Sequence, residues 1–247
     1  MPATLLESNL VLDPADDYSK PPRGEDLPFE DGEPLESPWH RDAMNVLIHS
    51  LESHWLGRKD FYAGGNMFIH FSTTRVMNKD FRGPDFFLVL GTDHEPLRKS
   101  WVVWEEAGRY PNVVVELTSE TTRHIDRVVK KELYRGTWRT GEYYCYDPNG
   151  HRIEGWRLVD SQYVPIEPDL NGRLWSSQME LYLGNAKGSL ADGREDRWPR
   201  WFDSEGNLVL LPNELEKQRA EAEKFRADTA EAELVRLKLE LNKLKGA

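Results

Sequence analysis

Apolar positions recur at steps of three and four in PWHRDAMNVLIHSLESHW, residues 38–55, and predict an amphipathic helix. Its buried face would comprise Met44, Leu47, Ile48, Leu51 and Trp55. Three strand-like segments follow. Residues 66–76 alternate between apolar and polar in places, whereas PDFFLVLG at 84–91 and PNVVVEL at 111–117 are apolar runs typical of buried strands.

A second helical pattern covers residues 121–141, in which Ile125, Val129 and Leu133 define the expected buried stripe. Gly136 or Gly141 marks its expected end. Further strands are expected in EYYCYDPNG at 142–150, which enters a turn, and in segments 152–160, 162–168 and 173–184.

The C-terminal segment has a heptad-like pattern instead, which predicts a long helix able to form a coiled coil. Its apolar positions are Leu215, Ala222, Phe225, Leu234, Leu237, Leu241 and Leu244, and their register shifts after Phe225. Three parts are therefore expected: an acidic, proline-rich lead-in at 1–37, a globular domain at 38–212 and the helix at 213–247. A solvated helix that packs on its own domain is the alternative to a coiled coil.

Charge changes the picture because it is unevenly distributed. The net charge is −11, but residues 1–37 alone carry ten acids and two bases. Residues 122–139 form a basic patch within the globular part, with Arg123, Arg127, Lys131 and Arg135 as candidates for phosphate contacts.

Two further observations indicate the cellular compartment. Cys145 is the single cysteine, which excludes an intramolecular disulfide and a cysteine-based zinc cluster. No apolar stretch approaches the roughly 18 residues of a membrane span. A reducing cytoplasm without membrane attachment is the simplest expectation.

Glu116 directly follows three valines near the end of an expected buried strand, where an unpaired carboxylate is costly in free energy. An arginine, a metal ion or water could satisfy it. Asp85 begins the preceding strand, so the two carboxylates, with the backbone carbonyl of Leu117, could bind one Mg²⁺ ion. Lys130 on the following helix could orient or deprotonate a water, with a pKa lowered by burial. The plain alternatives are a turn residue at Asp85, an arginine partner for Glu116, and an ion pair between Lys130 and Asp126.

The order of these features resembles the Uma2 family within the PD-(D/E)xK nuclease superfamily. The matching elements are PDFFLVL, PNVVVELTSETT, the step-of-four set Asp126, Lys130 and Tyr134, and GEYYCYDP, within residues 36–185. The resemblance implies an α/β (α+β) fold, with a restriction-endonuclease-like mixed sheet flanked by helices and a long C-terminal helix.

The resemblance also implies roles. Asp85 and Glu116 match the metal ligands, and Lys130 matches the lysine that this family carries on the helix. Thr118 occupies the position where the superfamily usually has that lysine. Lys131 competes with Lys130, but only Lys130 shares a face with Asp126 and Tyr134.

Two further positions bear on the resemblance. Tyr144 replaces a family tryptophan, a departure expected to affect packing. His40 matches a helix-start histidine, although an exposed polar residue is the plainer interpretation. His40 and Asp126 are therefore accessory candidates.

The implied function is a Mg²⁺- or Mn²⁺-dependent endonuclease that cleaves duplex DNA as a homodimer. Two other classes stay open. One is a catalytically inactive nuclease-like binding module, and the other is an assembly protein organised by the C-terminal helix.

Overall fold

The computed structural model describes residues 21–29, 37–72, 81–95, 97–119, 124–190 and 192–245. Most of the acidic lead-in lies outside these ranges, as does Arg123. The division into 1–37, 38–212 and 213–247 stays a prediction.

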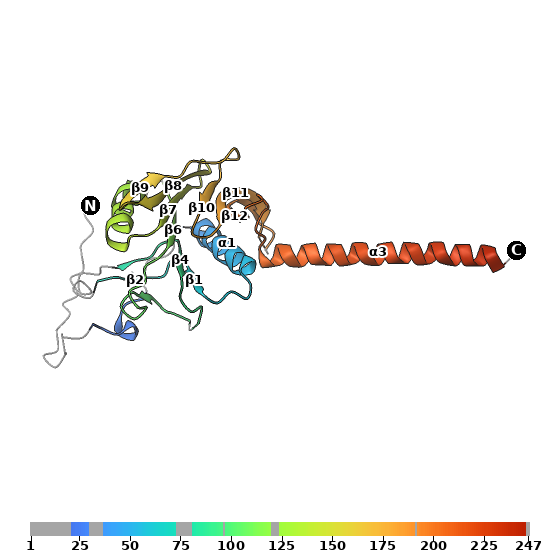
Figure 1. Ribbon diagram of the computed structural model, residues 1–247, viewed down its shortest axis with the longest axis horizontal. Coiled ribbons are helices and arrows are strands. Elements are labelled where there is room, and N and C mark those ends of the chain that lie inside the picture. Colours follow the sequence, from blue (N-terminus) through green and yellow to red (C-terminus); the bar gives the residue numbers. More distant parts are fainter. Residues whose placement is uncertain are drawn as a thin grey trace.

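A six-stranded mixed sheet forms the centre of the molecule (Figure 1). Its strands, in spatial order, are β1 (Phe61–Gly64), β4 (Phe86–Leu90), β6 (Val113–Leu117), β7 (Glu142–Asp147), β8 (Arg152–Val159) and β9 (Gln162–Pro165). The β6–β7 pair is parallel and every other pair in this sheet is antiparallel. The expected α/β (α+β) class, with a mixed sheet and a long C-terminal helix, is confirmed.

Two smaller sheets flank the centre. One comprises β10 (Leu174–Ser176), β11 (Leu181–Ser189) and β12 (Glu195–Phe202), and the other β2 (Ile69–His70), β3 (Phe81–Arg82) and β5 (Trp101–Val102). The strand expected at 66–76 is thus short among the described residues, because β2 has two residues and 73–80 lie outside them.

The predicted first helix is present as α1 (Pro38–His54), with Ser37 as N-cap and Pro38 in its first turn. Leu47 and Leu51 on its buried face pack against Phe86 and Val115 of the central sheet. Trp201 of β12 donates its indole N–H to the Leu47 carbonyl, so α1 is held between the central sheet and the β10–β12 sheet.

The opposite face of the central sheet is covered by a helix over residues 125–138. It comprises a π-helical turn at Ile125–Lys130, α2 at Lys131–Leu133 and a second π-helical turn at Tyr134–Trp138. A short 3-10 helix at Gly24–Asp26 and the helix α3 (Pro212–Lys245) complete the described elements.

Two expectations for the 125–138 helix are wrong. Ile125 and Val129 are 47% and 53% exposed, while Asp126, Tyr134 and Trp138 are buried against the sheet. The buried acids on this side need a cation and hydrogen-bond donors, and that requirement outweighs the burial of two apolar side chains. The helix ends at Arg139, which adopts the left-handed conformation at φ 54°, rather than at either glycine.

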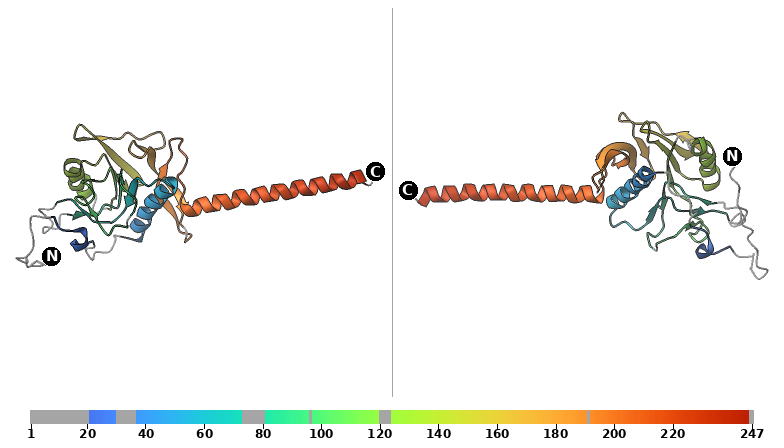
Figure 2. Two further views of the ribbon diagram at one scale, coloured as in Figure 1. Left: turned by 60° about the horizontal axis from the view of Figure 1, so that its bottom comes forward. Right: turned by 180° about the vertical axis from the view of Figure 1, so that it is seen from behind.

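Helix α3 extends away from the rest of the chain as a straight rod (Figures 1 and 2). None of its residues is buried. Among the described helices, none combines the length and the apolar character that a membrane crossing requires.

Candidate active site

Asp85 and Glu116 are brought together by the pairing of β4 with β6. The antiparallel register aligns Phe86 with Val115, so the residues one step beyond, Asp85 and Glu116, face each other at the sheet edge. Asp85 Oδ2 accepts a hydrogen bond from the backbone N–H of Leu117 at 2.7 Å. The strands themselves therefore fix both carboxylates.

Lys130 reaches this pair from the 125–138 helix. Its Nζ atom lies 2.9 Å from Glu116 Oε2 and 2.8 Å from Asp126 Oδ1. Tyr134, one helical turn further on, donates its hydroxyl to Glu116 Oε1 at 2.7 Å. Asp126, Lys130 and Tyr134 thus share the helix face that meets Glu116, as their spacing predicts.

The pKa values of Asp85 and Lys130 in this cluster are both raised, but for different reasons. Burial, reinforced by the negative charge of Glu116, raises the pKa of Asp85 well above its ordinary value. Burial alone would lower the pKa of Lys130, but Glu116 and Asp126 outweigh it and raise that pKa. In the metal-free site the lysine is therefore a firmly held ammonium group, and the fall in its pKa expected beside a metal ion stays a prediction.

His40 contacts the edge of the same site. Its Nε2 atom lies 3.0 Å from the Leu117 carbonyl, and its Nδ1 lies 2.9 Å from Ser37 Oγ. Because a carbonyl oxygen only accepts, Nε2 is the protonated nitrogen in this contact. His40 is 7% exposed, so the interpretation of His40 as an exposed surface residue is wrong.

The donor set fits a divalent cation. Burial and the charge of Glu116 make the ionised form of Asp85 costly, and a cation bound between the two carboxylates would relieve that cost. The Leu117 carbonyl keeps a second lone pair beyond its contact with His40. No group of three acidic, histidine or cysteine side chains gathers as a metal cluster in the described part of the chain. Two carboxylates with a carbonyl and waters match the preference of Mg²⁺ better than that of zinc.

The basic residues predicted to contact phosphates are already engaged within the protein. Arg127 pairs with Glu154 at 2.7 Å, and Lys131 places its ammonium 3.6 Å from the centre of the Trp156 ring. Arg135 donates to Glu132 and to the Ser161 carbonyl. Lys131 consequently points away from the carboxylates, and Lys130 alone of the two lysines reaches them.

A second buried glutamate, Glu142, escaped the sequence analysis. It is fully buried at the start of β7, where it accepts from Arg157 at 3.1 Å and from the backbone N–H and hydroxyl of Ser177, each at 2.8 Å. Ser176 and Tyr144 also donate to it. With its oxygens satisfied, Glu142 ties β7 to β8 and to the β10 segment and is a structural residue.

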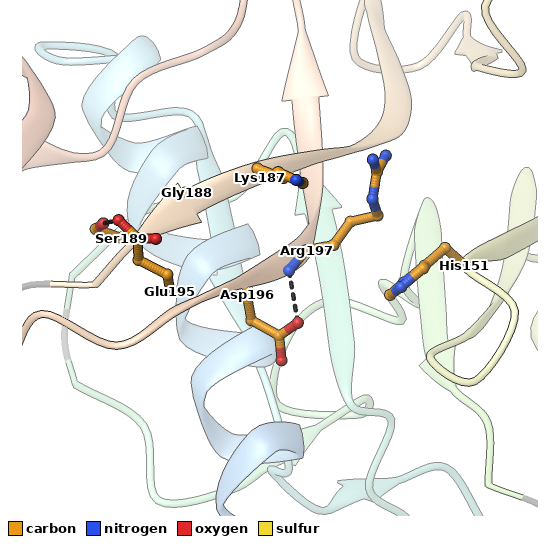
Figure 3. Close-up of a pocket in the computed structure, with 7 residues that line it drawn as sticks. All are labelled: His151, Lys187, Gly188, Ser189, Glu195, Asp196 and Arg197. Atoms are coloured by element: carbon orange, nitrogen blue, oxygen red, sulfur yellow. Dashed lines mark hydrogen bonds between the residues drawn. The ribbon is translucent and has the colours of Figure 1, made fainter.

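Two cavities lie between His40, at the edge of the site, and the β11–β12 hairpin. One of about 380 Å³ is lined by Ser37, Trp39, His40, Ser119, Pro148, Asn149, His151 and Asp196. The other, of about 540 Å³, shares His151 and Asp196 and adds Lys187, Gly188, Ser189, Glu195 and Arg197 (Figure 3). The smaller cavity therefore reaches the site at His40, and the larger one lies beyond it, on the far side of His151 and Asp196.

A mixed sheet that presents two facing carboxylates to a helix-borne lysine defines a restriction-endonuclease-like protein. The chain belongs to the Uma2 family, described as "Putative restriction endonuclease", whose pattern matches residues 15–186.

One similar solved structure is that of a "putative nuclease belonging to DUF820" from Anabaena variabilis ATCC 29413. It is 13% identical, covers 63% of this chain and 85% of its own, and superimposes with a TM-score of 0.43. A comparison with curated proteins finds no match.

Proposed function

We propose that this chain is a divalent-metal-dependent endonuclease that hydrolyses phosphodiester bonds in duplex DNA and acts as a homodimer in the cytoplasm. Family membership supports a nuclease role in general. The observation that carries the finer proposal is the facing pair Asp85 and Glu116 with the Lys130 ammonium 2.9 Å from Glu116.

Asp85, Glu116 and the Leu117 carbonyl would hold Mg²⁺ or Mn²⁺. A bound divalent cation supplies Lewis-acid chemistry, since it polarises a phosphoryl oxygen and makes water more acidic. Lys130 supplies a fixed positive charge for the negative charge that develops on the phosphate. Its raised pKa favours this role over proton abstraction.

Three neighbours act as positioning residues in this proposal. Asp126 holds the Lys130 ammonium at 2.8 Å, and Tyr134 orients Glu116. His40 fixes the Leu117 carbonyl through its Nε2 atom. The first two contacts each hold a side chain that would otherwise adopt several rotamers, and the third is a hydrogen bond to a backbone oxygen of the site.

Phosphate contacts are proposed at two places. Arg127, Lys131 and Arg135 lie on the helix of the site and would have to exchange internal partners, and Arg123, which is outside the described residues, is the fourth candidate. Lys187 and Arg197, with His151, line the larger cavity and would bind a nucleic-acid backbone that continues past His40 (Figure 3).

The test is cleavage of supercoiled plasmid in Mg²⁺, Mn²⁺ and EDTA by the wild type and by Asp85→Asn, Glu116→Gln and Lys130→Ala. Lys59→Ala serves as the control, because that lysine is exposed in the loop between α1 and β1. We expect cleavage by the wild type and the control only, and only with metal.

Two results would contradict the proposal. Equal cleavage by all variants would reveal a contaminating nuclease. Absence of cleavage by the wild type, on duplex DNA, single-stranded DNA and RNA alike, would favour a catalytically inactive binding module or an assembly protein.

A further inference from the structure

Helix α3 exposes a continuous apolar seam. Alternating steps of three and four residues connect Ala227, Ala230, Leu234, Leu237, Leu241 and Leu244. The four leucines are 50–78% exposed, and no residue of α3 is buried. A helix of 34 residues is about 50 Å long, and a helix of this kind is ordinarily stabilised by packing against a partner.

The seam corresponds to the a and d positions of a heptad, with Ala227, Leu234 and Leu241 at a. This register differs from the one that begins at Phe225, which lies off the seam. Val235 and Leu239 also lie off it, at b and f. In a two-stranded coil those three side chains would stay exposed.

Charges beside the seam indicate the orientation of the partner. In a parallel pair, each g residue meets the e residue five positions later on the second copy. Here Arg226 would meet Glu231, Glu233 would meet Lys238, and Glu240 would meet Lys245. All three contacts join opposite charges, and each occurs twice in a symmetric dimer. One less favourable contact, Arg219 with Lys224, precedes the apolar seam.

The antiparallel alternative has the wrong charges. If the two seams overlap fully, Leu241 faces Ala230 of the second copy, and Leu234 faces Leu237. Glu233 then meets Glu240 of the second copy, and Lys224 meets Lys245, so like charges face each other. Only the Glu231–Lys238 contact is attractive in that arrangement.

One of these charges, that of Glu240, already has a partner on its own helix. Arg236 and Glu240 form an exposed ion pair at 3.4 Å. Exposed i,i+4 pairs of this kind are weak, so Glu240 is available to a second helix.

We infer that α3 binds a second copy of this chain as a parallel two-stranded coiled coil. Both globular parts then lie at the same end of the coil, since each precedes its own α3. The assembly itself is independent of the proposed nuclease function, and only the use of two neighbouring sites on one duplex rests on that function.

Single cysteines test the orientation in the full-length protein. Leu241→Cys places identical thiols opposite each other only in a parallel pair, and Leu239→Cys, two residues away and off the seam, is its matched control. Cys145 is 2% exposed, so the wild type provides the background. Under mild oxidation we expect a disulfide-linked dimer from Leu241→Cys and at least tenfold less from Leu239→Cys.

A mixture of Ala230→Cys and Leu241→Cys chains tests the antiparallel alternative. In the parallel coil these positions are 11 residues, or about 16 Å, apart along the axis. We therefore expect homodimers from each chain and no mixed product. A dominant mixed disulfide would overturn the inference.

Charge exchange tests the interface without altering the seam. Glu233→Lys with Glu240→Lys should weaken self-association at least tenfold in analytical ultracentrifugation. Mixing that chain with one carrying Lys238→Glu and Lys245→Glu should restore a dimer of unlike chains.

A wild type that stays monomeric, or that forms tetramers through the Val235 and Leu239 side, would overturn the inference. None of these measurements depends on cleavage, so a monomeric wild type would remove the homodimer from the proposed function but leave metal-dependent cleavage untouched.

Discussion

Lys130 contacts Glu116 at 2.9 Å although the two residues belong to different elements, a helix and a strand, 14 positions apart. The superfamily position for this lysine holds Thr118, which is buried and bonded to the Tyr146 carbonyl. The helix therefore supplies the positive charge that the strand lacks.

Replacing Lys130 with alanine should destabilise the fold as well as remove activity. Glu116 and Asp126 would be left buried without their cation, and loss of one partner from a buried ion pair costs about 3–5 kcal/mol. Lys131→Ala should lose only the contact with Trp156, worth about 1 kcal/mol. Urea unfolding of both variants measures the difference, and equal losses would contradict the assignment.

Asp85→Asn should have the opposite effect on stability. Burial and Glu116 raise the pKa of Asp85, so its ionised form opposes folding at neutral pH, and this penalty is relieved as pH falls through the raised pKa. In EDTA at pH 7 we expect the variant to unfold with a free energy greater by on the order of 1 kcal/mol.

The same pair of proteins should respond differently to metal. Mg²⁺ should raise the melting temperature of the wild type, because it binds the folded state, but not that of Asp85→Asn. Asp228→Asn, an exposed change on α3, is the control. A variant less stable than the wild type in EDTA would show that Asp85 is a structural residue.

Glu142→Ala should be destabilising without affecting metal binding. The substitution leaves Arg157 and the Ser177 donors without their acceptor, and a loss of about 3 kcal/mol or more is expected. Calorimetry in EDTA and in Mg²⁺ checks both parts. A Mg²⁺-induced shift that disappears in this variant would place Glu142 at the metal site.

Glu214 should make the attachment of α3 sensitive to acid. Although burial opposes ionisation, hydrogen bonds from Arg200 and the Leu211 N–H lower the pKa of Glu214 below its ordinary 4.5. The ion pair thus stabilises the fold fully above about pH 4.5, and this contribution is lost as pH falls through the lowered pKa.

Glu214→Gln should consequently reduce stability at pH 7, by about 3 kcal/mol because Arg200 is fully buried, and should flatten the acid side of the stability profile. Glu216→Gln, on the exposed part of the same helix, is the control. Parallel pH profiles for the wild type and Glu214→Gln would contradict the prediction.

Loss of the ion pairs between the two α3 helices should alter the products of plasmid cleavage. If two sites act on one duplex, the wild type should linearise plasmid, whereas Glu233→Lys with Glu240→Lys should mainly nick it at the same protein concentration. Gel electrophoresis separates the two products. Unchanged linearisation by a chain shown to be monomeric would separate double-strand cleavage from assembly.

Prediction from sequence worked best where local pattern and geometry coincide. Asp85 and Glu116 adjoin apolar runs that form neighbouring strands, and a step of four residues distinguishes Lys130 from Lys131. These relations depend on the regular geometry of strands and helices, so the sequence alone contains them.

Long-range polar contacts were not predictable in this way. His40 was expected at the surface because its bond to the Leu117 carbonyl spans 77 residues. Of the residues that donate to Glu142, Arg157, Ser176 and Ser177 lie 15–35 residues away. The strand β12 was missed because it begins with charged residues and contains Pro199, both unusual in a strand.

The two carboxylates and Lys130 belong to different elements, and this division has a consequence for control of the site. The carboxylates belong to the sheet and the ammonium to the 125–138 helix, so the site is assembled only while Tyr134 and Trp138 keep that helix packed on the sheet. Any molecule that loosens or clamps the helix would therefore set the fraction of chains in which Lys130 reaches the carboxylates.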